Sequence, residues 1–239
     1  MATYLAITNE LLRRLNEVTI DQADFATVRN IQALAKDSIN ASIRGILQSA
    51  QEWPFTLQTE TQALTVGTNE YNFPADTSSV DWDTFYIKRL SGDTNYPSKL
   101  DVITYTEYLE NFRPQDEVNG VSGRGVPIRV YQTQDLKFGL TPIPDDTYEV
   151  EYKYWSFPTD LTLYDDTTII PDRFRHVIID GAMAYMMRFR SNEQSAAIHQ
   201  NNYSEGIRMM RRLLTDDPID MRSTYIVPNV YSRAFTRNG

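Results

Sequence analysis

The residues of this 239-residue chain that could carry chemistry are few: three pairs of adjacent aspartates, two histidines and one arginine between two glycines. The pairs Asp145-Asp146, Asp165-Asp166 and Asp216-Asp217 could act in general acid–base catalysis or bind a cation. Each pair lies beside a proline or the end of an expected strand, where aspartate is typical of turns and caps. We therefore expect the pairs to shape turns. The alternative for these pairs is a hydrolase that uses Asp145 or Asp165 in catalysis.

The histidines and the glycine-flanked arginine predict no metal or phosphate site. His176 and His199 lie in different expected helices, and the chain has neither an HExxH motif nor a cysteine that could complete a zinc site. Gly123-Arg124-Gly125 lacks the lysine and the strand-to-helix setting of a phosphate-binding loop. No GxSxG motif of serine hydrolases is present. We expect a protein that is not an enzyme and that uses no metal and no cofactor.

The composition argues against several classes of protein. Hydrophobic residues make up 41% and charged residues 23%, as in ordinary globular proteins. No apolar run approaches the roughly 20 residues that cross a bilayer, and the N-terminus has no signal-peptide pattern. We therefore expect neither membrane insertion nor secretion. Because the chain has no cysteine, it forms no disulfides.

The net charge of −9 is unevenly distributed along the chain. Residues 1–51 are neutral, residues 52–170 hold twenty acids and eight bases, and residues 171–239 hold seven acids and ten bases. An acidic chain is unsuited to sequence-independent DNA binding, which needs a basic surface. The acidic excess is typical of a solvated surface. Alternatively, acidic walls let DNA slide past, or acidic and basic surfaces of neighbouring subunits meet, with Arg208, Arg211 and Arg212 as candidates for the subunit interface.

Helical periodicity predicts a pair of helices at each end of the chain. The second N-terminal helix should end at Trp53-Pro54, because proline disfavours helical dihedrals in the residue before it. We expect Trp53, Pro54 and Phe55 to form a structural junction between helix and strands. In the C-terminal pair, Gly181 would let another helix approach closely, and Ser191 with Gln194 has the spacing of a capping box. The predicted buried stripe of the first helix of this pair consists of Phe174, Ile178, Ala182, Tyr185 and Phe189.

The middle of the chain alternates in polarity, as strands do. The clearest strand covers residues 148–154, where apolar or aromatic side chains alternate with charged ones. Residues 65–71 predict a hairpin turn between strands, and residues 104–112 a short helix. Residues 52–170 hold ten of the fifteen tyrosines. These tyrosines could fill the core of a small sheet, join subunits, or form a platform that binds a glycan or receptor.

The last 22 residues are too apolar for a free tail, because free tails are usually polar. We expect residues 218–239 to be an extended arm that docks on another surface. The docking residues would be Tyr225, Ile226, Val227, Val230, Tyr231 and Phe235.

Together these patterns predict an α+β fold. Residues 1–52 and 171–217 would form one discontinuous helical bundle domain, built from the N- and C-terminal helix pairs. Residues 53–170 would form an inserted, antiparallel, β-rich domain, and residues 218–239 the C-terminal extended arm.

Several motifs, in this order along nearly the whole chain, resemble the adaptor proteins that join head and tail in tailed phages, similar to the tail tubular protein A group of short-tailed phages. The motifs are Glu52-Trp53-Pro54-Phe55, Leu140-Thr141-Pro142-Ile143-Pro144-Asp145, the strand 148–154, Phe157-Pro158-Thr159-Asp160-Leu161, Asp165-Asp166, Ile170-Pro171-Asp172-Arg173-Phe174 and Gly181-Ala182.

The resemblance implies a structural virion protein that forms a homo-oligomeric ring, a dodecamer, docked beneath the portal protein. It also implies that a terminal arm, here residues 218–239, docks on the portal or on a neighbouring subunit. The lumen of the ring would pass DNA without sequence-specific binding, for genome retention and ejection, and its other rim would receive a tail nozzle or tail tube. It would be located at the head–tail junction of the virion, and in the host cytoplasm during assembly. A glycan- or receptor-binding tail module that uses the aromatic middle segment is the alternative function.

Overall fold

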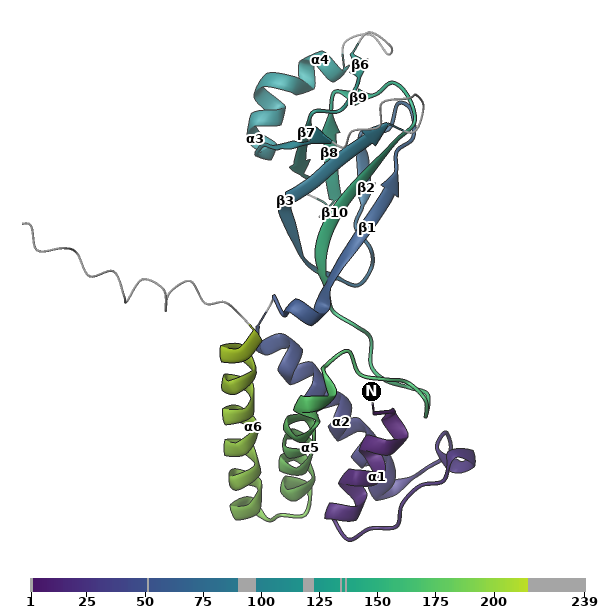
Figure 1. Cartoon of the computed structure of the whole chain (residues 1–239), viewed down its shortest axis with the longest axis vertical. Coiled ribbons are helices and arrows are strands. Elements are labelled where there is room, and N and C mark those ends of the chain that lie inside the picture. The colour runs from purple at the N-terminus through teal and green to yellow at the C-terminus, as the bar shows by residue number, and fades with distance from the viewer. Residues whose placement is uncertain are drawn as a thin grey trace, which may run out of the picture.

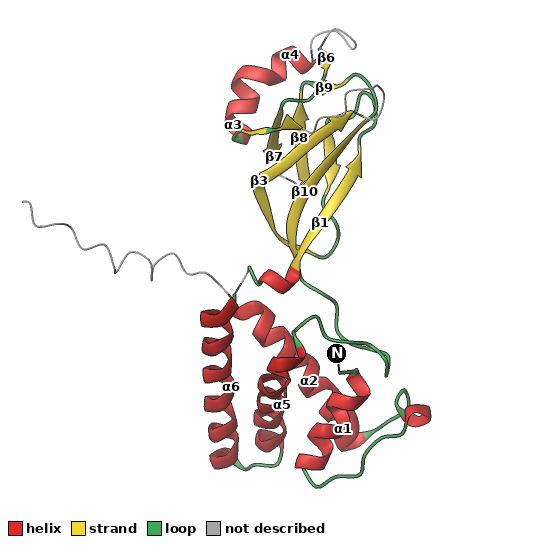
Figure 2. Ribbon diagram, viewed as in Figure 1, coloured by secondary structure: helices red, strands yellow, loops and turns green. Residues whose placement is uncertain are grey.

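The structure is a computed structural model that describes residues 2–50, 52–89, 98–117, 123–133, 135 and 137–214 (Figure 1). The described residues form an α+β fold with helices at one end of the molecule and strands at the other (Figure 2). The predicted fold class is therefore confirmed. The arm predicted at 218–239 lies outside the described residues, and so do its proposed docking residues Tyr225, Ile226, Val227, Val230, Tyr231 and Phe235.

The helical part combines two helices that precede the strands with two that follow them. α5 packs against α2 and α6, and α1 packs against α2 and α5. Thr3 caps α1, because its Oγ1 accepts a hydrogen bond from the Ala6 N–H at 3.3 Å. Short 3-10 turns precede α2, β1 and α5. The bounds are α1 Tyr4–Arg14, η1 Gln22–Asp24, α2 Asn30–Ser49, η2 Pro54–Thr56, η4 Asp172–Phe174, α5 Arg175–Phe189 and α6 Glu193–Leu214.

Gly181 lies at the closest approach of three helices. A Cβ atom added there would lie 2.2 Å from Oγ of Ser42 in α2 and 2.7 Å from the ring of Tyr203 in α6. The Tyr203 hydroxyl donates to the Ser42 carbonyl oxygen at 2.8 Å, and burial raises the pKa of Tyr203 to about 12, so this donor is retained at neutral pH. The close approach predicted at Gly181 is confirmed, and it involves two neighbouring helices at once.

Two details predicted for the C-terminal helices are wrong. Phe174, Ile178 and Ala182 are buried, but Tyr185 is half-exposed and Phe189 is 65% exposed. α2 meets α6 near its own C-terminal end and diverges from it toward the α5–α6 turn, so the side of α5 that carries Tyr185 and Phe189 is left exposed within the described residues, whereas Met183 and Met186 are buried (Figure 1).

The second error concerns the start of α6. Asn192, and not Ser191 with Gln194, opens this helix, because the Asn192 Oδ1 accepts a hydrogen bond from the Ser195 N–H at 3.1 Å. Ser191 instead adopts a left-handed φ of 59° in the turn between α5 and α6. A capping box needs its serine in extended backbone, so the sequence spacing alone was misleading.

The strands form two four-stranded sheets and one short pair within the described residues. The first sheet has the order β1 (Leu57–Ala63), β10 (Tyr148–Ser156), β3 (Thr77–Arg89), β4 (Ser98–Lys99). The second has the order β2 (Glu70–Asn72), β8 (Lys137–Thr141), β7 (Arg129–Gln132), β5 (Asp101–Val102). β6 (Arg124–Gly125) pairs with β9 (Ile143–Pro144). The pairs β5–β7 and β6–β9 are parallel, and the other pairs are antiparallel.

β10 lies between β1 and β3 in the first sheet, and its predicted alternation is confirmed. Tyr148, Val150, Tyr152 and Tyr154 are buried. Phe85 of β3 stacks on Tyr152, with ring centroids 4.7 Å apart, and Phe138 of β8 meets both rings. The two sheets therefore share one aromatic core, separate from the helical core.

The prediction of a hairpin at residues 65–71 is wrong. Gly67 has a φ of 81°, as a tight turn requires, but the turn connects strands of different sheets. β1 pairs with β10, and β2 pairs with β8. Turn residues determine where the chain reverses, whereas the partner of each strand depends on long-range packing.

The short helix predicted at residues 104–112 is confirmed and continues further. It comprises α3 (Tyr105–Glu107), the π-helical turn η3 (Tyr108–Phe112) and α4 (Arg113–Glu117). The Oγ1 of Thr104 accepts a hydrogen bond from the Glu107 N–H at 3.2 Å and caps its start.

The chain crosses between the helical part and the β part at two neighbouring points. It enters at Thr56, just before β1, and leaves at Ser156, at the end of β10. Both residues are buried, and the Ser156 hydroxyl donates to the Thr56 carbonyl oxygen at 3.1 Å. Leu57 and Trp155 are paired directly beyond this bond. Entry and exit are thus joined by one hydrogen bond and the first rung of the β1–β10 ladder.

Candidate subunit interface

The aspartate pairs that the structure describes serve in turns, as the sequence predicts. Asp145 accepts a hydrogen bond from the Tyr148 hydroxyl at 2.6 Å. Asp166 accepts backbone N–H bonds from Thr162 and Leu163, each at 2.7 Å, and these bonds hold the pKa of Asp166 below its usual value. Asp216-Asp217 lies outside the described residues.

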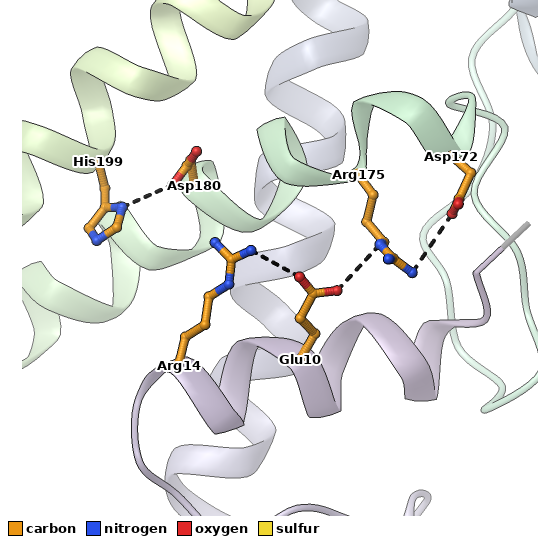
Figure 3. Close-up of polar contacts among 6 residues, drawn as sticks. All are labelled: Glu10, Arg14, Asp172, Arg175, Asp180 and His199. Carbon is orange, nitrogen blue, oxygen red and sulfur yellow. Dashed lines mark hydrogen bonds and ion pairs between the residues drawn. The ribbon is translucent and has the colours of Figure 1, made fainter.

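The two histidines lie on the helices. His176 is exposed on α5, and the Nδ1 of His199 in α6 lies 3.0 Å from the Asp180 carboxylate of α5 (Figure 3). Within the described ranges, no group of three or more His, Asp or Glu side chains is placed to hold a metal ion. No helix in the same ranges is long and apolar enough to cross a membrane.

A network of charged side chains ties α1 to the start of α5 (Figure 3). Glu10 lies between two arginines, 2.9 Å from Arg14 and 3.3 Å from Arg175. Arg175 also lies 3.9 Å from Asp172, and Arg190 pairs with Glu17 at the far end of α1. Partly exposed pairs of this kind contribute at most about 1 kcal/mol each. These charges are paired within the subunit.

The outward face of α6 carries apolar side chains that nothing covers in the described structure. Ile198, Met209 and Leu213 fall within roughly 60° around the helix axis, and Leu213 is 64% exposed. The side chains of α6 that are buried, Ala196, Gly206 and Met210, lie next to this stripe around the helix, so the stripe borders the buried face. An apolar stripe on the outside of a helix is typical of a surface that meets a partner.

The predicted interface arginines lie around this stripe, and all three are exposed. Arg212 and Arg208 lie on the same side of Met209, about 60° and about 100° from it around the helix axis, and Arg211 lies further round. Arg208 is 3.1 Å from Glu205, whereas Arg211 and Arg212 have no ion-pair partner within the described residues. We define Ile198, Met209, Leu213, Arg208 and Arg212 as the α6 face.

The junction residues pack on the helical side of the molecule. Trp53 is 1% exposed, and its indole N–H donates to the Ile46 carbonyl oxygen at 3.0 Å, in the last turn of α2. The Trp53 ring stacks on Phe55 with centroids 5.4 Å apart, and Pro54 begins η2, which leads into β1. These contacts support the role predicted for the junction, which remains a proposal.

The same packing bears on where the two predicted domains meet. Trp53 and Ile170 are buried in the helical core, and Phe157, Leu161 and Ile169 pack against it. We therefore propose that the boundaries lie near Thr56 and Ser156, at the crossing points, and not at 52/53 and 170/171.

A pocket of about 590 Å³ lies between α2 and the loop 157–169. Asn40 of α2 fastens this loop: its side-chain amide donates to the Leu161 carbonyl oxygen at 3.0 Å and accepts from the Leu161 N–H at 3.1 Å. The loop is also bonded to α1, because the backbone N–H of Tyr4 donates to the Asp166 carbonyl oxygen at 2.7 Å. No sequence pattern predicted this pocket. The available signal was a polar residue, Asn40, on the apolar stripe of a helix, because a buried amide requires a partner.

The Asn40→Ala substitution is expected to lower the free energy of unfolding by about 1–3 kcal/mol, because it leaves both backbone groups of Leu161 without their partner. The matched control is Asn201→Ala, at an exposed site on α6, with an expected change of about 0.5 kcal/mol or less. Hydrogen exchange should become faster at the Leu161 amide in Asn40→Ala only. Unchanged exchange at that amide would show that Asn40 does not hold the loop.

Comparison with known proteins gives one result over nearly the whole chain. A family model described as SU10 adaptor protein matches residues 2–228, which include both helix pairs and the strands between them. No curated protein matches the chain. The family match confirms the resemblance to phage adaptor proteins noted in the sequence.

Proposed function

Because the chain belongs to the SU10 adaptor protein family, a family of structural phage proteins and not of enzymes, we propose that it forms the adaptor ring at the head–tail junction of a phage virion. The observation that carries this proposal is the family match over residues 2–228, which spans the helical and the β part together. The uncovered α6 face supports it, because a ring buries a repeated contact between neighbouring subunits.

In this proposal the ring is a dodecamer that docks under the portal protein at one rim and receives a tail nozzle or tail tube at the other. DNA passes through its lumen without sequence-specific binding, in keeping with a net charge of −9. The subunit would be made in the host cytoplasm and end in the virion.

The arm proposed at residues 218–239 would make assembly sequential, with the portal in place before this subunit docks. An apolar tail that folds only on a portal loses its conformational entropy at that moment, so docking requires the portal to be in place. Its docking residues, Tyr225 to Val227 with Val230, Tyr231 and Phe235, provide the apolar surface for this contact.

Deletion of residues 218–239 tests the arm. We expect the truncated chain to remain folded, since both cores lie within residues 4–210, but to leave purified portals bare in negative-stain images. The full-length chain in the same preparation is the control. Portals decorated equally well by both chains would remove the arm from the mechanism. A full-length chain that decorates neither portals nor virions would argue against the adaptor function itself.

The alternative function, glycan or receptor binding through the aromatic middle segment, gains little support. Tyr71, Tyr148, Tyr152 and Tyr154 are buried in the core of the β part, and Tyr131 is buried against the Tyr108 ring. Buried rings are unavailable as a platform. A glycan array probed with the purified chain distinguishes the two functions, and specific binding there would favour the alternative.

A further inference from the structure

The α6 face lies on one side of the helical part, and the pocket beneath the loop 157–169 lies on the other. Figure 1 shows α6 and this loop, the green segment that follows β10, separated by α2 and α5. Two different surfaces on opposite sides of one subunit can repeat in a heterologous contact, which closes a ring when the rotation between subunits allows it.

The pocket presents uncompensated negative charge. Asp160, Asp165 and Asp166 all line it, and only Asp160 is paired, 3.3 Å from Arg44. Asp165 is exposed and has no ion-pair partner within the described residues. Asp166 is held in its charged form by the two backbone N–H bonds described above. Carboxylates held in place on a fastened loop form a preorganised partner for a cation.

The pocket also offers apolar surface of its own. Ile43 and Leu47 of α2 lie along its wall, and Leu163, on the loop, is 61% exposed. The neighbouring Tyr164 is partly exposed as well. A partner that fills this pocket must therefore combine apolar side chains with positive charge.

The α6 face has this combination. Met209 and Leu213 provide the apolar side chains, and Arg212, which has no ion-pair partner within the described residues, provides the positive charge. Complementary charge of this kind favours the correct partner and disfavours contacts between like surfaces.

We propose that the α6 face of each subunit docks into the Asp165 side of the pocket in the next copy of the same chain. The inference rests on the proposed ring and specifies which two surfaces close it. Arg212 faces Asp165 and Asp166 of the neighbour, and Leu213 with Met209 lies against Leu163. The contact is heterologous, so every subunit uses both surfaces once.

Cysteine cross-linking in assembled virions tests this pairing cleanly, because the natural chain has no cysteine. A chain carrying both Leu213→Cys and Leu163→Cys should give, on mild oxidation, a ladder of covalent oligomers. Each single variant alone should give none, and a mixture of the two single variants should give dimers only. The matched control combines Leu213→Cys with Asp83→Cys, whose side chain is 89% exposed on β3, and should give no ladder.

The outcomes separate this inference from the proposed function. Virions that contain the chain but yield no ladder would overturn the pairing and leave the adaptor function standing. Covalent dimers from Leu213→Cys alone would show an isologous contact, and a cross-link from Leu213→Cys to another virion protein would give the α6 face a different partner; either result overturns the pairing. Absence of the chain from virions would contradict the proposed adaptor function, on which the pairing rests.

Charge reversal provides a second measurement. Arg212→Glu and Asp165→Arg, each added to the double-cysteine chain, should both reduce the yield of the ladder, because each puts like charges opposite one another. Asp83→Arg, an equal charge change on the β part, should leave the yield unaltered. A ladder insensitive to both Arg212→Glu and Asp165→Arg would contradict the proposed charge pairing.

Discussion

The Trp53→Ala substitution is expected to lower the free energy of unfolding by about 3–5 kcal/mol, the usual cost of removing a large aromatic side chain from a core. Trp53 is 1% exposed in the helical core and stacks on Phe55. Its indole N–H also bonds the Ile46 carbonyl oxygen, which lies in the last turn of α2, where carbonyl groups lack partners within the helix. The substitution therefore removes core packing together with one of the two side-chain hydrogen bonds that the Ile46 carbonyl oxygen accepts. Chemical denaturation followed by circular dichroism at the helical signal measures the effect.

Two control variants separate these contributions. Trp53→Phe keeps an aromatic ring but loses the N–H; since the Ser49 hydroxyl also donates to the Ile46 carbonyl oxygen, at 2.6 Å, the loss should be limited to about 1 kcal/mol. Trp155→Ala removes a partly buried tryptophan from β10, and its cost should be smaller than that of Trp53→Ala. A Trp53→Ala protein with an unchanged denaturation midpoint would exclude a core role for this residue.

The Gly181→Leu substitution is the second change with a large expected effect, a loss of about 3 kcal/mol or more in the free energy of unfolding. Its first side-chain atom would lie 2.2 Å from Ser42 Oγ and 2.7 Å from the Tyr203 ring. Because these contacts belong to α2 and α6, both helices must move away from α5. Leucine is a far better helix former than glycine, by somewhat under 1 kcal/mol, so helix propensity opposes this loss without offsetting it.

The matched control is Ala197→Leu, which adds a large side chain at an exposed site on α6 and should change stability by about 0.5 kcal/mol or less. A double-mutant cycle sharpens the test. Ser42→Ala removes the atom nearest to the new side chain, so the Gly181→Ala substitution should cost less in a Ser42→Ala background than in the natural chain. Equal costs in both backgrounds would show that α2 and α5 do not meet at these two residues.

Local signals in the sequence predicted several elements correctly. Alternation predicted β10, and proline predicted that α2 ends by Trp53-Pro54; the helix ends about one turn earlier, at Ser49, and Ala50 is already extended. Both rest on interactions between near neighbours in the chain, such as backbone dihedrals and the two faces of a strand. The close helix approach at Gly181 was also predicted, because a glycine within an apolar helical stripe indicates close packing.

Features that depend on contacts between distant segments could not be predicted from local sequence patterns. Phe189 has the spacing of a buried residue, but its exposure depends on how α2 and α6 diverge. The turn at Gly67 was correctly located, yet its strands joined different sheets. Asn40 and Leu161 are 121 positions apart, and no periodicity relates them. The pocket proposed as the neighbour's docking site arises from this contact, so only the fold could reveal it.

The bond between Thr56 and Ser156 has a consequence for how such a molecule can change over time. Because entry and exit of the β part are neighbours, the whole insert can be lengthened, shortened or exchanged for another without altering the distance between α2 and α5. Recombination at these two sites, which are adjacent in space, would then replace the β part and leave unchanged the helices that we propose contact neighbouring subunits.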